Sequence, residues 1–334
     1  MGSDFTKGWH ELGNGQLAYL QPSGTWGYSN AGLIVDSGDA LLVDTLFDQR
    51  LTAEMLRELE GRFAIPVAQI STLVNTHANG DHTYGNSLIT SAQIIASEAS
   101  MHEMQTEDSP EYIAAIMKQT EAMGDLGIYL KEIFGAFNFD EITPRLPDKT
   151  FTNEHVIDVG DKKVHLIEVG PAHTSGDVIV YVPTDKAVYT GDILFVDGTP
   201  VMWAGPVGNW LKACDRILAM DVETIIPGHG PVTDKAGVRS MQSYLRFLEK
   251  ETRERHAVGM KSWDIAQDIA ANEFDHWSDA ERIAVTVDTI CREIEGDQNP
   301  RNVTELFSRM MQLDKRSNPN RYDPCCKLNC NVMY

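Results

Sequence analysis

Short, mostly apolar and β-branched runs that end in polar glycine turns are the feature that most constrains this chain. Residues 70–74 form such a run, and the turn after it, residues 75–86, packs two imidazoles and a carboxylate close together. Three later segments repeat the pattern beside a glycine, which lets the backbone turn tightly. The polar residues of the four turns are His77, Asp81 and His82, then His173, Asp192 and His229. Short runs of this type favour strands, so we expect these side chains where strands end.

Imidazole nitrogen and carboxylate oxygen are ligands of zinc, iron and manganese, and several must converge to hold a divalent ion. One motif alone, such as Gly-His-Gly at 228–230, is a weak signal, but four in one chain favour a metal site. The remaining histidines lack such partners, and we interpret them as packing or solvent-exposed residues. They are His10, His102, His155, His165, His256 and His276.

Taken in order, the four motifs resemble the metallo-β-lactamase superfamily, whose metal loop reads H-x-H-x-D-H and is followed by a later His, Asp and His. The resemblance covers about residues 15 to 235. It implies an α/β fold, the four-layer αβ/βα sandwich. It further implies a first metal site with His77 and His173, a second with Asp81, His82 and His229, a bridging Asp192, and an Asp44 that supports the metal loop from behind.

Asn79 departs from the family pattern, because it stands where the second histidine of the metal loop is expected. An amide oxygen is a neutral and weaker ligand than imidazole. Three interpretations remain open: two metal ions with Asn79 as a weak ligand, a single ion at the second site, or a single iron. The expected cofactor is Zn²⁺, as one or two ions, with iron or manganese as alternatives.

The strand and helix pattern predicts layered α/β packing with additions. Residues 31–36 and 40–44 flank a Ser-Gly-Asp turn and predict a hairpin. We expect a metallo-β-lactamase-like domain over residues 1–240 with a helical insertion at about 98–142, a helical extension over 241–313, and a mobile tail at 314–334. Ser278 and Glu281 have the spacing of a capping box ahead of a helix at 283–294. Cys325, Cys326 and Cys330 are interpreted as free thiols on the tail.

Charge and hydropathy exclude some classes of function. The formal net charge of −21 would repel a phosphate backbone, and no basic cluster with interleaved aromatics offsets it, so we expect no nucleic-acid partner. No run of 18 or more apolar residues and no secretory signal pattern is visible in the sequence. We therefore expect no membrane partner, a cytoplasmic location, a small-molecule substrate and a possible homodimer.

Two segments could form the substrate pocket. The helical insertion is rich in Met and Phe and is interpreted either as ordinary packing or as a lid over the metal site. The loop 195–210 follows Asp192 directly and is the stronger candidate. The pocket residues predicted on this basis are Tyr84, Met202, Trp203 and Trp210.

The ligand chemistry predicts a hydrolase. A divalent ion lowers the pKa of bound water to about 7 in favourable sites and so yields a hydroxide at neutral pH. We expect Asp81 to be catalytic, orienting that hydroxide, and the substrate to be a small-molecule ester, thioester or lactone. Two alternatives stay open: a non-haem iron oxygenase on the same fold, and a non-catalytic binding protein with a degenerate metal site.

Overall fold

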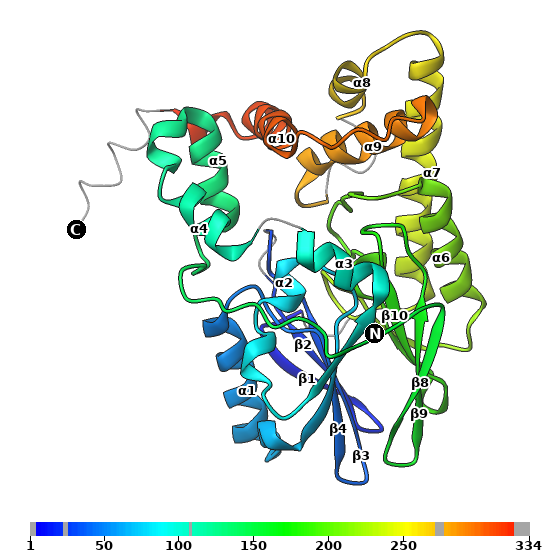
Figure 1. Ribbon diagram of the computed structural model, residues 1–334. Coiled ribbons are helices and arrows are strands. Elements are labelled where there is room, and N and C mark those ends of the chain that lie inside the picture. The colour runs from blue at the N-terminus through cyan, green and yellow to red at the C-terminus, as the bar shows by residue number, and fades with distance from the viewer. Residues whose placement is uncertain (1–4, 23–25, 107–108, 271–276, 324–334) are drawn as a thin grey trace.

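The polar turns lie on two β-sheets in the computed structural model, which describes residues 5–22, 26–106, 109–270 and 277–323 (Figure 1). The first sheet contains β1 (Gly8–Gly13), β2 (Gln16–Leu20), β3 (Ala31–Asp36), β4 (Asp39–Val43), β5 (Ile70–Val74), β6 (Gln93–Ser97) and β7 (Lys149–Phe151), in that spatial order. Strands β1 to β4 pair antiparallel, and β4 to β7 pair parallel. The predicted hairpin is confirmed, since β3 and β4 pair through a tight turn in which Ser37 and Gly38 both have positive φ.

The second sheet is also mixed. Its strands, in spatial order, are β12 (Thr224–Ile226), β11 (Ala187–Tyr189), β10 (Val178–Val182), β9 (Lys162–Glu168) and β8 (Glu154–Val159). Strands β11 and β12 pair parallel, whereas β8 to β11 pair antiparallel. A parallel neighbour needs a crossover connection, and helix α6 (Val207–Ala219) supplies it between β11 and β12.

Three apolar clusters show how the layers pack. Residues from the inner faces of both sheets, such as Leu41 and Val180, form one cluster between the sheets. Helix α1 (Gln49–Phe63) packs on the outer face of the first sheet through Leu51, Met55 and Leu59. Helices α6 and α7 (Lys235–Ala257) cover the second sheet. The predicted four-layer αβ/βα arrangement is confirmed.

Further helices form a cap at one end of this sandwich (Figure 1). They are α3 (Glu98–Thr106), α4 (Pro110–Met117) and α5 (Gly124–Phe134) from the insertion, and α8 (Ser262–Ile269), α9 (Ile283–Glu295) and α10 (Val303–Ser317) from the C-terminal extension. Helix α10 lies against α5, and Lys315 Nζ on α10 is 2.5 Å from Asp125 Oδ2 on α5. Two segments far apart in the sequence thus build one cap.

The predicted capping box at Ser278 and Glu281 is wrong. The Glu281 carboxylate accepts hydrogen bonds from Trp26 Nε1 at 3.2 Å and from the Tyr129 hydroxyl at 2.9 Å. A short 3₁₀ turn, η6 (Ala280–Arg282), precedes α9 without a side-chain cap. Glu281 therefore ties the extension to the N-terminal region and the insertion instead of capping its own helix.

The segment expected to be a mobile tail begins inside a folded element. Residues 314–317 belong to α10, and η7 (Pro319–Tyr322) follows. The Tyr322 side chain is buried, and its hydroxyl donates to the Asp314 carboxylate at 2.5 Å. Residues 324–334, including the three cysteines of the tail, lie outside the described residues. Within the part of the chain that the structure describes, no helix has the length and apolar character needed to cross a membrane.

Candidate metal centre

The polar turns meet at one edge of the sandwich. His77 and His82 follow β5, with His82 on the short helix α2 (Gly80–Thr83). His173 lies in the connection from β9 to β10, Asp192 in the 3₁₀ turn η5 (Gly191–Ile193) after β11, and His229 after β12. The strand-end positions predicted from the sequence are therefore where the structure places these residues.

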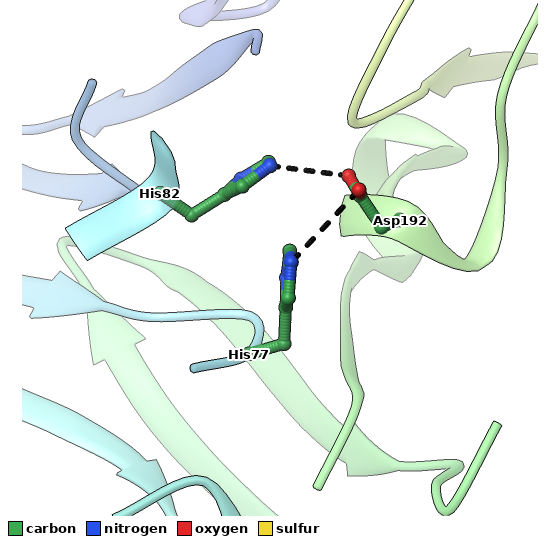
Figure 2. A group of neighbouring side chains, drawn as sticks. All are labelled: His77, His82 and Asp192. Atoms are coloured by element: carbon green, nitrogen blue, oxygen red, sulfur yellow. Dashed lines mark ion pairs between the residues drawn. The ribbon is translucent and has the colours of Figure 1, made fainter. Parts of the chain in front are cut away.

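Asp192 lies at the centre of the imidazoles. Its Oδ1 is 3.1 Å from His82 Nε2, and its Oδ2 is 3.4 Å from His173 Nε2, 3.4 Å from His229 Nε2 and 3.9 Å from His77 Nε2. Figure 2 shows His77 and His82 pointing at this carboxylate from the metal loop, while Asp192 approaches from the other sheet. One carboxylate thus faces all four imidazoles.

Asp81 joins the second half of the cluster. Its Oδ2 is 3.3 Å from His229 Nε2 and 3.8 Å from His82 Nε2. Two overlapping groups of described residues have donor atoms within 4.8 Å of one another: His77, His82 and Asp192, and Asp81, His82 and His229. The structure brings together all six residues that the sequence predicts as ligands.

Three of the imidazoles are oriented by contacts of Nδ1, the ring nitrogen that faces away from the centre. His82 Nδ1 lies 2.9 Å from Asp44 Oδ2 and His173 Nδ1 lies 2.6 Å from the Val201 carbonyl, and both oxygens can only accept. His77 Nδ1 is 3.0 Å from Thr76 Oγ1, whose own proton goes to Asp44. With Nδ1 protonated, each ring turns the lone pair of Nε2 into the centre, as a metal ligand requires.

Several inward atoms have no hydrogen-bond partner among the described residues. They are His77 Nε2, His82 Nε2 and Asp192 Oδ1, and all three are buried. A buried polar atom without a partner is costly, so such atoms call for an explanation. Three converging donors of imidazole and carboxylate type fit a divalent metal ion.

The pKa values divide the histidines into two classes in the protein without metal. Burial holds the pKa of His77 well below its usual value and lowers that of His173. Burial acts in the same direction on His229, but Asp192 and Asp81 outweigh it and raise its pKa to about 9. Burial also opposes the charge on His82, yet Asp192, Asp81 and Asp44 raise its pKa well above 6.5. His77 and His173 are thus ready as neutral ligands, whereas His82 and His229 must release a proton first.

Asn79 faces the first of the two predicted sites. Its Oδ1 lies 2.8 Å from His173 Nε2, and the side chain also lines the adjoining cavity. The amide therefore stands beside a predicted ligand of the first site, on the side that faces the metal centre.

A cavity of about 450 Å³ opens next to the metal loop. Its volume suits a small organic molecule. The wall is mostly aromatic and apolar, with a few charged groups: Trp26, Gly27, Phe47, Asn79, Gly80, Asp81, Tyr84, Glu103, Thr106, Ile113, Phe134, Trp203, Arg301, Val303 and Phe307. The cavity wall therefore contains residues of the insertion, of the C-terminal extension and of the sandwich.

The predicted pocket residues separate into two pairs. Tyr84 and Trp203 line the cavity. Met202 and Trp210 are instead fully buried core residues, and Trp210 Nε1 donates to the Ile193 carbonyl at 2.9 Å. No spacing or motif in the sequence distinguishes Trp26, Arg301 and Phe307 from ordinary packing residues, so these wall residues were not predicted. Phe134 belongs to the insertion, which the sequence left open as packing or a lid, and it lines the cavity.

Comparison with known proteins agrees with this geometry. The family model described as "Metallo-beta-lactamase superfamily" matches residues 24–229, which is more than half of the chain. The chain is 23% identical over 202 residues to the 2,4-dinitroanisole O-demethylase subunit alpha of Nocardioides sp. (strain JS1661), covering 58% of this chain and 50% of that protein. It is 29% identical over 117 residues to a hydroxyacylglutathione hydrolase of Brucella anthropi, covering 33% and 45%.

Among solved structures, the sec-alkylsulfatase Pisa1 from Pseudomonas sp. superposes with a TM-score of 0.66 at 15% identity. The match covers 89% of this chain and 52% of that one, so it includes regions outside residues 24–229. In all three comparisons the chain spans about half the length of the other protein.

Proposed function

The chain belongs to the metallo-β-lactamase superfamily, and from this premise we propose that it is a zinc-dependent hydrolase of a small-molecule ester, thioester or lactone. The family and the buried His/Asp cluster support a metallohydrolase. The bond, the metal and the substrate are our proposal.

One observation supports this proposal most directly. His77 Nε2, His82 Nε2 and Asp192 Oδ1 are buried and converge on one point, and none of them forms a hydrogen bond with a described residue, although His82 Nε2 and Asp192 Oδ1 are in ion-pair contact at 3.1 Å. This centre adjoins a cavity large enough for a small organic substrate, and Asp81 belongs to both. A metal ion held here would act on a molecule bound in the cavity.

A divalent ion bound at this centre would supply a hydroxide nucleophile at neutral pH and polarise the substrate carbonyl. The residues of the chain would hold and orient the reactants. Burial opposes the charge on Asp81, but His82 and His229 hold its pKa at about 2, so its carboxylate stays ionised and can accept a hydrogen bond over the whole neutral range. Asp81 is therefore the residue that we propose to orient the attacking water.

The class of bond rests on the cavity and on relatives. The mostly aromatic wall favours an apolar acyl or alcohol group over a sugar or a nucleotide. Two similar proteins, a hydroxyacylglutathione hydrolase and a sec-alkylsulfatase, are named for hydrolytic reactions, which agrees with the proposed chemistry. An oxygen ester, a thioester or a lactone is the proposed target.

The experiment joins metal content to turnover. We would purify the protein without added metal, measure metals by mass spectrometry, and assay a panel of esters, thioesters and lactones. Asp81→Ala should abolish turnover while the melting temperature stays within a few degrees, and Asp158→Ala, an exposed carboxylate on β8, serves as the matched control.

Zinc together with hydrolysis that Asp81→Ala removes is the expected result. One iron per chain with oxygen-dependent turnover would favour the oxygenase alternative. Protein that gains no metal even when zinc is added would contradict a metallohydrolase and favour a binding protein.

A further inference from the structure

The substrate cavity extends beyond the part of the chain that the family model matches. Its wall combines Asn79 and Asp81 of the metal loop with Arg301 and Phe307 of the C-terminal extension. The family model ends at residue 229, so the residues that the extension brings to the cavity lie outside the matched region. Arg301 is the one arginine or lysine in the described wall.

Arg301 has few partners of its own. One guanidinium nitrogen, Nη1, donates to Thr289 Oγ1 at 2.7 Å, and the side chain forms no ion pair with any described residue. A guanidinium carries several N–H donors in a planar fork, so most of the donors of Arg301 stay available. A partly buried cation without a counter-charge is energetically unfavourable.

The acids nearest to Arg301 are already engaged. Asp288 Oδ1 lies 3.2 Å from Arg309 Nη1, and Asp297 Oδ2 lies 2.7 Å from Arg292 Nη1. Burial lowers the pKa of Arg301, and these acids offset that effect only in part. The missing counter-charge is therefore not supplied by the neighbouring carboxylates.

The acids of the cavity wall also have their own partners. Glu103 accepts hydrogen bonds at 3.1 Å from both the backbone nitrogen and the hydroxyl of Ser175. Asp81 pairs with His229 at 3.3 Å. Among the described residues of the cavity wall, Arg301 is consequently the cation without an ion pair.

An aromatic cluster lines the same cavity as Arg301. The ring of Phe307 is 5.8 Å from that of Trp26, 6.3 Å from Trp203 and 6.0 Å from Phe134, measured between centroids. All four rings line the cavity. A ligand that fills it would have an apolar body against these rings and an anionic group within reach of the guanidinium.

We propose that Arg301 binds a carboxylate on the non-reacting part of the substrate, which makes it a specificity-determining residue. The proposal rests on the proposed hydrolase function and narrows its substrate class to apolar esters, thioesters or lactones that also carry a free carboxylate. The planar guanidinium fork matches a carboxylate with two parallel hydrogen bonds.

The first test measures binding without turnover. Calorimetry would measure the affinities of phenylbutanoate and of its uncharged analogue phenylbutanamide. The proteins compared are wild type, Arg301→Gln, Arg301→Lys and Arg316→Gln. Arg316 is an exposed arginine on α10, the helix that begins two residues after Arg301, and it bonds Gln267, so it is the matched control. Each protein is measured both metal-free and zinc-loaded, because a carboxylate can also bind zinc.

Wild type should bind the carboxylate more tightly than the amide, and Arg301→Gln should weaken only the carboxylate, by about tenfold or more. Arg301→Lys keeps the charge but loses the fork, so it should fall between the two. Arg316→Gln should match wild type. Equal weakening of both ligands by Arg301→Gln would show a structural role and overturn the proposal. Wild type without a carboxylate preference would overturn it regardless of whether the variants fold.

The second test uses a matched pair of substrates. The phenyl monoester of adipic acid keeps a free carboxylate, and the phenyl ester of adipamic acid is the analogue in which an uncharged amide replaces that carboxylate. Arg301→Gln should raise KM for the first substrate by about tenfold, leave kcat similar, and change neither constant for the second. Cleavage of both esters with no effect of Arg301→Gln would overturn the role of Arg301 alone. Failure to cleave any ester would count against the hydrolase, while the binding test would still decide the role of Arg301.

Discussion

Asn79 Oδ1 lies 2.8 Å from Nε2 of His173, so the amide that replaces the expected histidine of the metal loop stands directly beside a predicted ligand of the first site. The Asn79 side chain therefore still points toward the metal centre, as the expected histidine would. The same residue lines the adjoining cavity, so it lies between the proposed metal centre and the proposed substrate pocket.

Asn79→His should strengthen zinc binding at the first site by about tenfold, because imidazole is a better zinc ligand than an amide. Asn79→Ala should weaken it, since the first site loses the amide oxygen as a weak ligand. Competition with a chelator measures both affinities, and mass spectrometry gives the number of ions per chain. Equal affinities in the three proteins would show that Asn79 has no part in metal binding.

Asp44→Asn should weaken metal binding by about tenfold to a hundredfold, although Asp44 is not itself a predicted ligand. Asp44 accepts a hydrogen bond from His82 Nδ1 and also accepts from the backbone and hydroxyl of Thr76, so one carboxylate orients the metal loop. Chelator competition checks the affinity. Asp39→Asn, an exposed aspartate at the start of β4, is the control and should bind metal as wild type does.

The stability of the metal-free protein should depend on pH through His229. Burial opposes its charge, but Asp192 and Asp81 raise its pKa from 6.5 to about 9. A raised folded-state pKa adds stability that is complete below pH 6.5 and is lost as the pH rises toward 9, with a size on the order of 3 kcal/mol at most. Denaturant unfolding of wild type and His229→Gln from pH 6 to 9.5 measures it. The stability difference between them should shrink as pH rises, and a constant difference would contradict the raised pKa.

Trp203 and Trp210, which follow Asp192 in the sequence, should respond differently to truncation to alanine; Trp210 lies on helix α6. Trp210 is fully buried and donates to the Ile193 carbonyl, so Trp210→Ala should cost about 3–5 kcal/mol of unfolding free energy. Trp203 lines the cavity, so Trp203→Ala should raise KM for apolar substrates with a much smaller loss of stability. Chemical denaturation and steady-state kinetics on both variants test this assignment. A raised KM in Trp210→Ala together with a large loss of stability in Trp203→Ala would instead indicate that Trp210 lines the substrate pocket.

Sequence reasoning identified the residues of the His/Asp cluster because each lies in a short motif at the end of a strand. The runs before His77 and before Asp192 are strands β5 and β11, and their turns meet as expected. It was less successful with Glu281, whose spacing suggested a capping box. The carboxylate instead bonds Trp26 and Tyr129, two partners that are remote in the sequence.

The sequence by itself determined the strand ends, the chemistry of the ligands and the departure at Asn79, since these depend on residue type and local spacing. Only the tertiary structure decided that Met202 and Trp210 are core residues and that Arg301 and Phe307 line the substrate cavity. Apolar residues look alike in sequence whether they face a core or a cavity. The choice depends on how helix α10 of the extension docks against helix α5 of the insertion, and that packing joins segments far apart in the chain, which no local pattern specifies.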